Sequence, residues 1–358
     1  MRRSVIIGTG RYIPTVKVGT KDFEKNKFFL DYGQPIDAAD NEKTVSKFQE
    51  ITEIGERRYA EDDQVTSDLG VLAAEQAIEN AGIDKEDLDY IIFAHNFGDV
   101  VAGNRRSDFC PTLAARVKQR LEIVNPECIA YDLPFGCPGW VQGMIQADYY
   151  LRSGDAKHAL VIGGETLSRI SDPHDRDSMI YSDGAGATIL EARDTDEEIG
   201  ILSHAARSDT IDHASLMWMG QTYEEGTGDE TLYLKMFGRK LYNYALTNVP
   251  GVVKKSLDKA GVGLEEVKKL FIHQANAKMD EAILKRLFKL YGVSEIPEDI
   301  MPMTISWLGN SSVATVPTLI DLVARGEMNG QKVEPGEIVI IASVGAGMNV
   351  NSIIYRWV

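Results

Sequence analysis

The chain contains the same pattern of residues twice, about half its length apart. AGIDKEDLDYIIFA occupies residues 81–94 and AGVGLEEVKKLFIH occupies residues 260–273, so position 94 corresponds to position 273, an offset of 179 in a chain of 358 residues. In each copy the Ala-Gly pair closes an amphipathic helix, a short acidic loop follows, and an apolar strand comes next. A long internal repeat restricts the fold to two similar units.

The order of the other predicted elements is also the same in both halves. Residues 130–133 lead to Gly136-Cys137 and a helix, and residues 303–308 lead to Gly309-Asn310 and a helix. The apolar run 158–165 corresponds to 337–344, and both are typical of buried strands. Any two α/β halves share some of this order, but two matching element lengths favour duplication. We predict an α/β fold of two halves, 1–195 and 196–358, each a mixed sheet flanked by helices.

The helices that follow Cys137 and Asn310 are rich in small and apolar residues. We expect them to be buried between the two sheets, because a helix that is apolar on several faces needs cover on more than one side. Ligands of open α/β sheets lie beyond the strand ends. Equivalent loops of both halves should therefore converge on one site that contains Cys137, His273, Asn310 and the turn 345–347.

Composition and charge exclude several classes of function. The chain has 38 Lys and Arg against 54 Asp and Glu, a net charge of −16, which disfavours binding to nucleic acid or to an anionic membrane. No run of ~18 apolar residues is present, and Ser4 to Gly8 is too short for a signal peptide, so it predicts a strand. The three cysteines and six histidines lack the paired spacing of a disulfide framework or a metal site. We expect a cytoplasmic protein.

Cys137 is the candidate nucleophile. It stands in Gly136-Cys-Pro-Gly139, between an apolar strand and a helix. A proline suits the first position of a helix, and a thiol at a helix N-terminus is expected to have a lowered pKa because of the unpaired N–H groups there. A structural role is the commoner fate of a free cysteine, and it is the interpretation that we favour for Cys110 and Cys128.

Three further positions can assist a thiol nucleophile. His273 ends the strand LFIH, where it is either a structural histidine or a donor facing the site. Asn310 is either a helix N-cap or a donor to a thioester carbonyl, and with His273 it could stabilise an enolate. The turn SVGAGMN at 343–349 exposes backbone N–H groups. The amides of Ala346 and Cys137 together could form an oxyanion hole.

The chain resembles β-ketoacyl-acyl-carrier-protein synthase III, of the thiolase-like superfamily, nearly from end to end. The resemblance is carried by VIIGTGRYIP, ITEIGERRYAEDD, AGIDKEDLDYIIFA, FGCPGW, RISDPHDR, YSDGAGATIL, FIHQAN, GNSSVATVP and the C-terminal GAG turn. The HQAN and GNSSVATVP pair is specific within the superfamily, because plant-type polyketide synthases usually carry His-Pro at the first position and thiolases carry Gly-His-Pro and a second catalytic cysteine. The implied fold is a duplicated thiolase-like one with five αβαβα layers.

The resemblance implies a condensation in two stages without a cofactor. A starter acyl group moves from acyl-CoA to Cys137, and malonyl on acyl carrier protein then loses carbon dioxide and attacks the acyl-enzyme. By motif, His273 and Asn310 activate the malonyl thioester. The resemblance also implies that the protein is a homodimer and that it acts in fatty acid biosynthesis. A specialised ketosynthase or acyltransferase of secondary metabolism, of the alkylresorcinol or polyketide type with a longer starter, is the alternative, and a non-catalytic scaffold is a more distant one.

Three positions relate to how this chain would bind its acyl donor. The family type has an adenine-gripping tryptophan that SKFQEITEIGERR lacks, so Phe48 is the candidate replacement, and Arg169 matches the family's contact to the nucleotide. Cys110 stands where the family type has a bulky residue at the tip of the acyl pocket. A smaller residue there would permit a longer starter.

A cluster of cations follows the HQAN motif on a predicted helix. Its members are Lys278, Lys285, Arg286 and Lys289. In an acidic chain such a cluster is either a solvated helix face or a docking surface for the acidic acyl carrier protein, which complementary charge would steer. Lys278 is also a candidate contact to the substrate, because it is nearest to the site.

Overall fold

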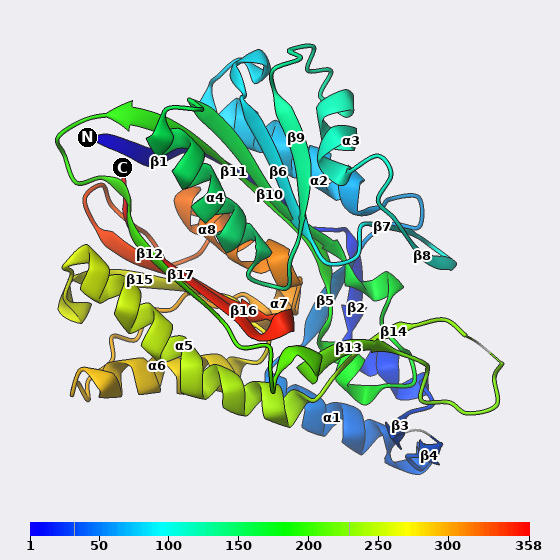
Figure 1. The fold of residues 1–358 in the computed structure, drawn as a ribbon. Helices are drawn as coiled ribbons and strands as arrows, with labels where there is room; N and C mark the ends of the chain where they lie inside the picture. The colour runs from blue at the N-terminus through cyan, green and yellow to red at the C-terminus, as the bar shows by residue number, and fades with distance from the viewer. Residues whose placement is uncertain (32, 229) are drawn as a thin grey trace.

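The computed structural model describes residues 1–31, 33–228 and 230–358, and it contains two central sheets (Figure 1). The first sheet has the order β1 (Arg2–Tyr12), β11 (Asp183–Asp194), β10 (His158–Thr166), β6 (Tyr90–His95), β9 (Ile129–Pro134). The pairs β1–β11 and β11–β10 are antiparallel, whereas β10–β6 and β6–β9 are parallel. This is the mixed sheet expected for the first half.

The second sheet repeats this plan with four strands. Its order is β12 (Gly200–Ser208), β17 (Asn349–Arg356), β16 (Ile338–Gly345), β15 (Val267–Ile272). Here β12–β17 and β17–β16 are antiparallel and β16–β15 is parallel, the same sequence of directions as in β1, β11, β10 and β6. The strands of each sheet come from one half of the chain, and the division of the domains at 195 stays a prediction.

Helices form the other three layers. The two helices between the sheets are α4 (Gly139–Ser153) and α8 (Thr315–Ala324) (Figure 1). Their apolar side chains form one buried cluster with strands of both sheets, as Trp140 and Leu319 do with Val161 and Ile341. The outer layers are α2 (Thr66–Ala81) with α3 (Leu113–Arg120) on one side and α5 (Gly238–Ala260) with α6 (Ala277–Leu290) on the other. The predicted five-layer αβαβα fold is confirmed.

The repeated Ala-Gly pairs end equivalent helices. Helix α2 ends at Ala81 and α5 ends at Ala260, and the glycines that follow, Gly82 and Gly261, have φ values of 66° and 67°. This left-handed conformation at a helix C-terminus favours glycine. After a short 3₁₀ turn the chain enters β6 or β15. The sequence repeat is therefore a repeat of helix end, turn and strand.

Shorter helices and strand pairs lie outside the two central sheets, on the side where the strands β6 and β15 end. They are α1 (Asn41–Thr52), α7 (Ile305–Leu308) and the strand pairs β2–β5 (Val16–Gly19, Glu56–Tyr59), β3–β4 (Phe29–Asp31, Gln34–Pro35), β7–β8 (Asp99–Val101, Asn104–Asp108) and β13–β14 (Met217–Gly220, Tyr233–Met236). Among the described residues no helix is long and apolar enough to cross a membrane.

The close contact between β1 and α2 predicts that adding one methyl group at Gly10 lowers the stability of the fold. A Cβ at Gly10 would lie 2.2 Å from the carbonyl oxygen of Ala73, whereas a Cβ at Gly251 in α5 would meet nothing within 4 Å. Gly10→Ala should lower the free energy of unfolding by about 1–3 kcal/mol, since the backbones must move apart. Gly251→Ala should raise it by about 0.5–1 kcal/mol through helix propensity. Urea denaturation of both variants checks this, and equal effects would contradict the packing described.

Candidate active site

Cys137 lies in the turn between β9 and α4, with Pro138 at the N-cap of the helix. Its side chain is 8 % exposed. The hydroxyl of Ser312, which comes from the other half of the chain, donates a hydrogen bond to the Cys137 Sγ over 3.3 Å. The thiol therefore sits at a strand-to-helix turn, as the sequence predicts, and is contacted by the loop that contains Asn310.

The expected lowering of the Cys137 thiol pKa is a wrong prediction. Burial raises this pKa to about 11, the hydrogen bond from Ser312 lowers it, and the charge of Glu165 raises it. The sequence argument considered only the helix terminus and could not see that the thiol would be enclosed, which disfavours the thiolate. Cys137 is therefore a neutral thiol at neutral pH.

His273 follows β15 and is buried. Its backbone N–H donates to the carbonyl of Ala342 over 3.0 Å, which extends the pairing of β15 with β16 by one residue. Burial lowers the pKa of the imidazole to about 4, and a hydrogen bond with the Ser312 backbone opposes this shift. His273 is consequently neutral at pH 7, so it can donate one N–H without carrying a charge.

Asn310 is held by its backbone on both sides. Its N–H donates to Ile180 over 2.9 Å and its carbonyl accepts from the N–H of Ser182 over 2.9 Å. Its Oδ1 accepts the N–H of Ser312 over 2.8 Å. This bond resembles the cap that the sequence offered as one interpretation, and it also orients the amide. With Oδ1 occupied, the Nδ2 group is the part of the side chain that remains to donate.

Gln274 ties the histidine loop to the asparagine loop. This buried side chain donates to the carbonyl of Pro302 over 2.8 Å and accepts the N–H groups of Thr304 and Ile305 over 2.8 and 3.0 Å. Thr304 and Ile305 begin α7, which leads directly to Asn310. The buried side-chain amide of Gln274 thus links the loop that follows His273 to the segment that leads to Asn310, and this link fixes how far apart the two residues lie.

The turn of β16 packs directly on the turn that carries the thiol. A Cβ at Gly345 would lie 2.5 Å from the backbone nitrogen of Cys137, and a Cβ at Gly136 would lie 2.6 Å from that of Ala346. Neither position has room for a side chain, so the two turns pack backbone against backbone and the amides of Cys137 and Ala346 lie close together. This proximity is what an oxyanion hole from Cys137 and Ala346 requires.

A cavity of about 190 Å³ opens beside the thiol. Most of its lining is apolar, from the strand pair β13–β14 and the segments that follow β6 and β10. The lining residues are Asn96, Phe97, Cys137, Leu167, Tyr181, Met217, Trp218, Met219, Leu234, Ser312 and Ala346. It is smaller than the roughly 300–1,000 Å³ that drug-sized ligands occupy, so it suits a short apolar group attached to Cys137.

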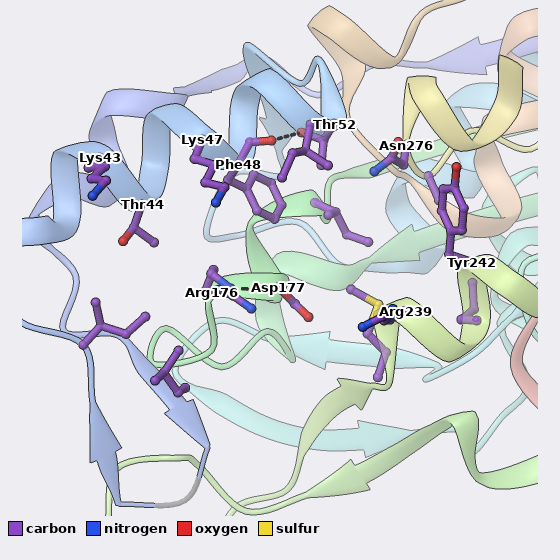
Figure 2. A pocket seen from close by; sticks show the side chains of 18 of the residues that line it. Lys43, Thr44, Lys47, Phe48, Thr52, Arg176, Asp177, Arg239, Tyr242 and Asn276 are labelled. Atoms are coloured by element: carbon purple, nitrogen blue, oxygen red, sulfur yellow. Dashed lines mark hydrogen bonds and ion pairs between the residues drawn. The ribbon is translucent and has the colours of Figure 1, made fainter. Parts of the chain in front are cut away.

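A larger cavity of about 800 Å³ lies next to this one (Figure 2). The hydroxyl of Tyr181, in the small cavity, donates to the Met236 sulfur, in the large one, over 3.7 Å, so the two share a wall. In Figure 2, Phe48 and Lys47 of α1 face Tyr242 and Arg239 of α5 across the opening. Phe48 therefore lines this cavity, and its role as the replacement for an adenine-gripping tryptophan stays a prediction.

The sequence reading missed the cations of this larger cavity. Exposed basic side chains line it on three sides, from α1, from the turn that follows residue 175, and from α5: Lys43, Lys47, Arg176 and Arg239. A signal was available for two of them, because Lys43 and Lys47 are four residues apart and share one face of a helix.

Arg169 does not line either cavity, contrary to the prediction that it contacts a nucleotide. Its Nη2 donates to the backbone carbonyl of Glu61 over 2.7 Å, so the guanidinium holds a loop. Arg176, seven residues further in the same motif, lines the large cavity instead.

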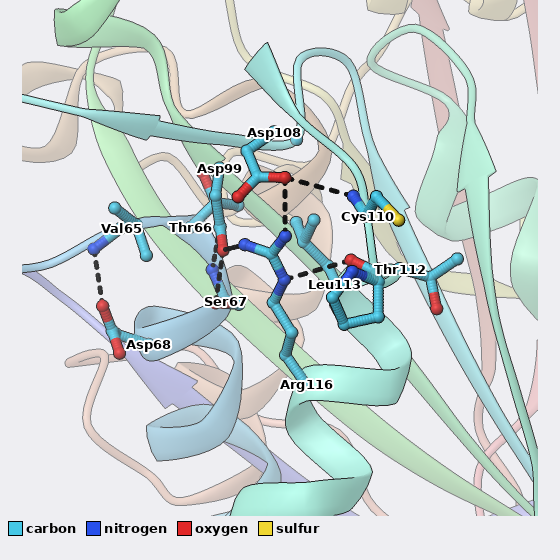
Figure 3. A network of polar contacts seen from close by, with 12 residues as sticks. Val65, Thr66, Ser67, Asp68, Asp99, Asp108, Cys110, Thr112, Leu113 and Arg116 are labelled. Atoms are coloured by element: carbon cyan, nitrogen blue, oxygen red, sulfur yellow. Dashed lines mark hydrogen bonds and ion pairs between the residues drawn. The ribbon is translucent and has the colours of Figure 1, made fainter. Parts of the chain in front are cut away.

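Cys110 is exposed and lies outside the lining of the cavity beside Cys137, so within this chain the prediction of an acyl-pocket tip is not met. A polar network places it (Figure 3). The Arg116 guanidinium pairs with Asp99 over 2.6 Å and with Asp108 over 2.8 Å, and Asp108 accepts the N–H of Cys110 over 3.1 Å. This network anchors the pair β7–β8 and the start of the segment that contains Cys110. Cys128 is buried, as expected for a structural residue.

The four cations of α6 are all exposed, but they are not equally free. Lys285 pairs with Glu281 over 3.3 Å, and the Arg286 Nη1 donates to the carbonyl of Leu246 in α5 over 3.1 Å. Lys278 lies two residues after Asn276, which lines the large cavity. Lys278 and Lys289 mark the two ends of this basic face. Within the described residues no group of three His, Cys, Asp or Glu side chains could hold a metal ion.

The duplicated five-layer fold with a buried thiol between its halves defines a thiolase-like condensing enzyme. Two family descriptions match the chain, 3-oxoacyl-[acyl-carrier-protein] synthase III over residues 131–210 and its C-terminal domain over 257–357. The β-ketoacyl-[acyl-carrier-protein] synthase III of Paracoccus denitrificans is 32% identical and covers 100% of both chains. That of Xanthomonas oryzae is 34% identical over 99% of this chain and 98% of its own.

Among solved structures, 3-oxoacyl-(acyl carrier protein) synthase III from Pseudomonas aeruginosa superposes with a TM-score of 0.80, at 25% identity, over 99% of this chain and 98% of that one. The chain belongs to the β-ketoacyl-acyl-carrier-protein synthase III family. It is an acyltransferase of the condensing type, and the main reading of the sequence is confirmed.

Proposed function

We propose that Cys137 carries the starter acyl group and that His273 and Asn310 activate the malonyl thioester. The observation that carries this proposal is the gathering of these three buried side chains around Ser312, at the end of a small apolar cavity. Residues from both halves of the chain contribute, as the duplication requires. A scaffold would not need them together.

In the first stage the Cys137 sulfur attacks the carbonyl carbon of an acyl thioester. The negative charge on the carbonyl oxygen is stabilised by the amides of Cys137 and Ala346. The tetrahedral intermediate collapses, the C–S bond to the leaving group breaks, and the proton of the thiol leaves with the departing thiol. The acyl group then occupies the cavity of about 190 Å³.

In the second stage a malonyl thioester occupies the place of the first leaving group. Loss of carbon dioxide leaves a pair of electrons on the methylene carbon, with charge on the thioester oxygen. The neutral His273 and the Nδ2 group of Asn310 donate hydrogen bonds to this oxygen. The carbanion attacks the acyl carbon, the bond to Cys137 breaks, and the β-ketoacyl thioester leaves. The Cys137 thiolate that is released takes up a proton from solvent and returns to the neutral thiol.

The large cavity is the proposed route for the pantetheine arm of acyl-CoA and of malonyl-carrier protein. Its apolar floor suits the arm, and Lys43, Lys47, Arg176 and Arg239 at its opening suit the phosphates. Helix α6 would meet the carrier protein itself. We also propose a homodimer, a cytoplasmic location and a reaction that needs no cofactor. The longer starter of the secondary-metabolism alternative rested on Cys110, which lies outside the cavity.

The acylation stage predicts a mass adduct on one residue. Incubation with acetyl-CoA or butyryl-CoA should acylate Cys137 at least about tenfold faster than incubation with lauroyl-CoA, since the small cavity cannot take a long chain. Intact-mass spectrometry with peptide mapping checks this. Cys137→Ser should prevent the adduct, and Cys110→Ser should leave it unchanged. Faster acylation by lauroyl-CoA would contradict the chain-length assignment, and the absence of any adduct would contradict the function.

The condensation stage predicts variants that are acylated but do not condense. His273→Ala and Asn310→Ala should still form the Cys137 adduct, while turnover with malonyl-carrier protein falls by about 100-fold to 1,000-fold because a donor to the enolate is lost. Single-turnover acylation and release of labelled carbon dioxide measure the two stages separately. An equal loss in both stages would show that these residues serve the thiol rather than the malonyl group.

Carrier docking predicts a loss that depends on the substrate. Lys278→Glu with Lys285→Glu places two negative charges on one face of α6, seven residues apart, and should raise the KM for malonyl-carrier protein by about tenfold or more at low salt. Turnover of a small malonyl thioester should not change. Lys157→Glu with Lys332→Glu is the control. It makes the same charge change in the segments that precede β10 and β16, which enter these strands at the end far from the thiol. An equal effect of both doubles would contradict docking on α6.

A further inference from the structure

Ser312 contacts all three proposed catalytic residues. Its N–H donates to Asn310, its hydroxyl donates to the Cys137 sulfur, and its backbone has a hydrogen bond with His273. It holds a φ of 52°, in the left-handed region that a non-glycine residue rarely adopts. Such strain persists only where the surroundings over-determine it, and it concentrates at functional sites.

The direction of the Ser312 hydroxyl is fixed by Asn96, which follows β6. The Nδ2 group of Asn96 donates to the Ser312 Oγ over 3.0 Å. An amide nitrogen can only donate, so the serine oxygen is the acceptor in this contact. The single proton of the hydroxyl is therefore left for the Cys137 sulfur, 3.3 Å away.

Glu165, the penultimate residue of β10, holds Asn96 in turn. One carboxylate oxygen accepts both the backbone N–H of Asn96, over 2.8 Å, and its Nδ2 group. Glu165 is 1 % exposed. If the Asn96 amide flipped, its oxygen would face the serine oxygen and the Glu165 Oε1 that already accepts the Asn96 backbone N–H, so the flipped form is disfavoured. The order Glu165, Asn96, Ser312, Cys137 is thus a chain of contacts with a fixed polarity.

We propose that Glu165, Asn96 and Ser312 are positioning residues that direct one hydrogen bond at the Cys137 sulfur and so set its reactivity. The inference rests on the proposed function, because it takes Cys137 as the nucleophile. Asn96 does not pass a proton on, since an amide N–H is not exchanged as an acid or base in this pH range. Glu165 therefore acts through orientation and charge and not as a general base.

The two ends of this chain act on the thiol with opposite sign. The hydrogen bond from Ser312 lowers the pKa of Cys137, and the charge of Glu165 raises it. Burial raises the pKa of Glu165 itself to about 8, with a smaller contribution from Asp183. Glu165 is therefore neutral well below pH 8 and charged well above it. The hydrogen bond to sulfur helps attack at every pH, while the carboxylate charge opposes it only in alkaline solution.

Asp183, His273 and Tyr181 on the surrounding elements keep one protonation state above pH 7. Burial raises the pKa of Asp183 to about 6, so it is charged, and lowers that of His273 to about 4, so it is neutral. The pKa of Tyr181 is raised well above its usual value by burial. His95, at the end of β6, bonds to Asp132 and faces α3. A change of thiol reactivity between pH 7 and 10 therefore reports on Glu165 and Cys137.

The test is the rate at which iodoacetamide alkylates Cys137, followed from pH 6.5 to 10.5 by site-resolved mass spectrometry. Ser312→Ala should raise the thiol pKa by about one unit and slow alkylation at pH 8 about tenfold, because a hydrogen bond to the thiolate is lost. Asn96→Ala should shift the pKa in the same direction by less. Glu165→Gln keeps an acceptor and removes the charge, so it should lower the thiol pKa and speed alkylation above pH 8.

Ser311→Ala is the matched control, because the Ser311 hydroxyl bonds to Thr315 and not to the sulfur. It should leave the alkylation profile unchanged. Unchanged profiles in folded Ser312→Ala and Asn96→Ala, or a raised pKa in Glu165→Gln, would overturn the proposal. If Ser312→Ala does not fold, the other two variants decide. The assay uses no thioester, so a failure of Cys137 to accept any acyl group would count against the proposed function alone.

Discussion

The site depends on the close contact of two glycine turns, one from each half of the chain. Gly136 precedes the thiol and Gly345 ends β16, and each backbone lies so near the other that neither position has room for a Cβ. This contact sets the Cys137 and Ala346 amides side by side. It also fixes the distance between the two sheets at the point where α4 and α8 emerge. The proposed oxyanion hole would thus depend on how the halves dock, because each half supplies one of its two amides.

The frame was predictable because its signals are local and repeated. The Ala-Gly helix ends, the buried strands and the apolar helices after Cys137 and Asn310 were all visible in the sequence, and duplication made each signal count twice. His273 and Asn310 were identified for the same reason, since equivalent strand ends converge. Long-range partners were not predictable. Nothing near Asn96 in the sequence indicates its contact with Ser312, 216 residues away, or with Glu165, 69 residues away.

The errors have a common physical cause, which is that a motif does not fix the direction of a side chain. Arg169 and Arg176 belong to one motif, but the first is engaged by the backbone of Glu61 and the second lines the cavity. Cys110 follows a strand pair that Arg116 anchors, and it lies outside the lining of the small cavity. The pKa of Cys137 was misjudged because enclosure by the second half outweighs the helix terminus. Each error concerns tertiary surroundings and not local structure.

The thiol lies between the two central sheets, whereas several segments that line the cavities lie outside them. This difference has a consequence for which parts of the chain can vary in sequence. Gly136 and Gly345, in the turns that hold the thiol and the two amides, lie in backbone contacts that leave no room for a Cβ. The small cavity beside the thiol, by contrast, is lined in part by β13 and β14, and the larger cavity in part by α1, all outside the two central sheets. Substitutions or insertions in those segments can retune which molecules are admitted without disturbing the chemistry. Relatives of this chain can therefore differ in substrate preference by changes in the segments that line the cavities, while the turns around the thiol stay the same.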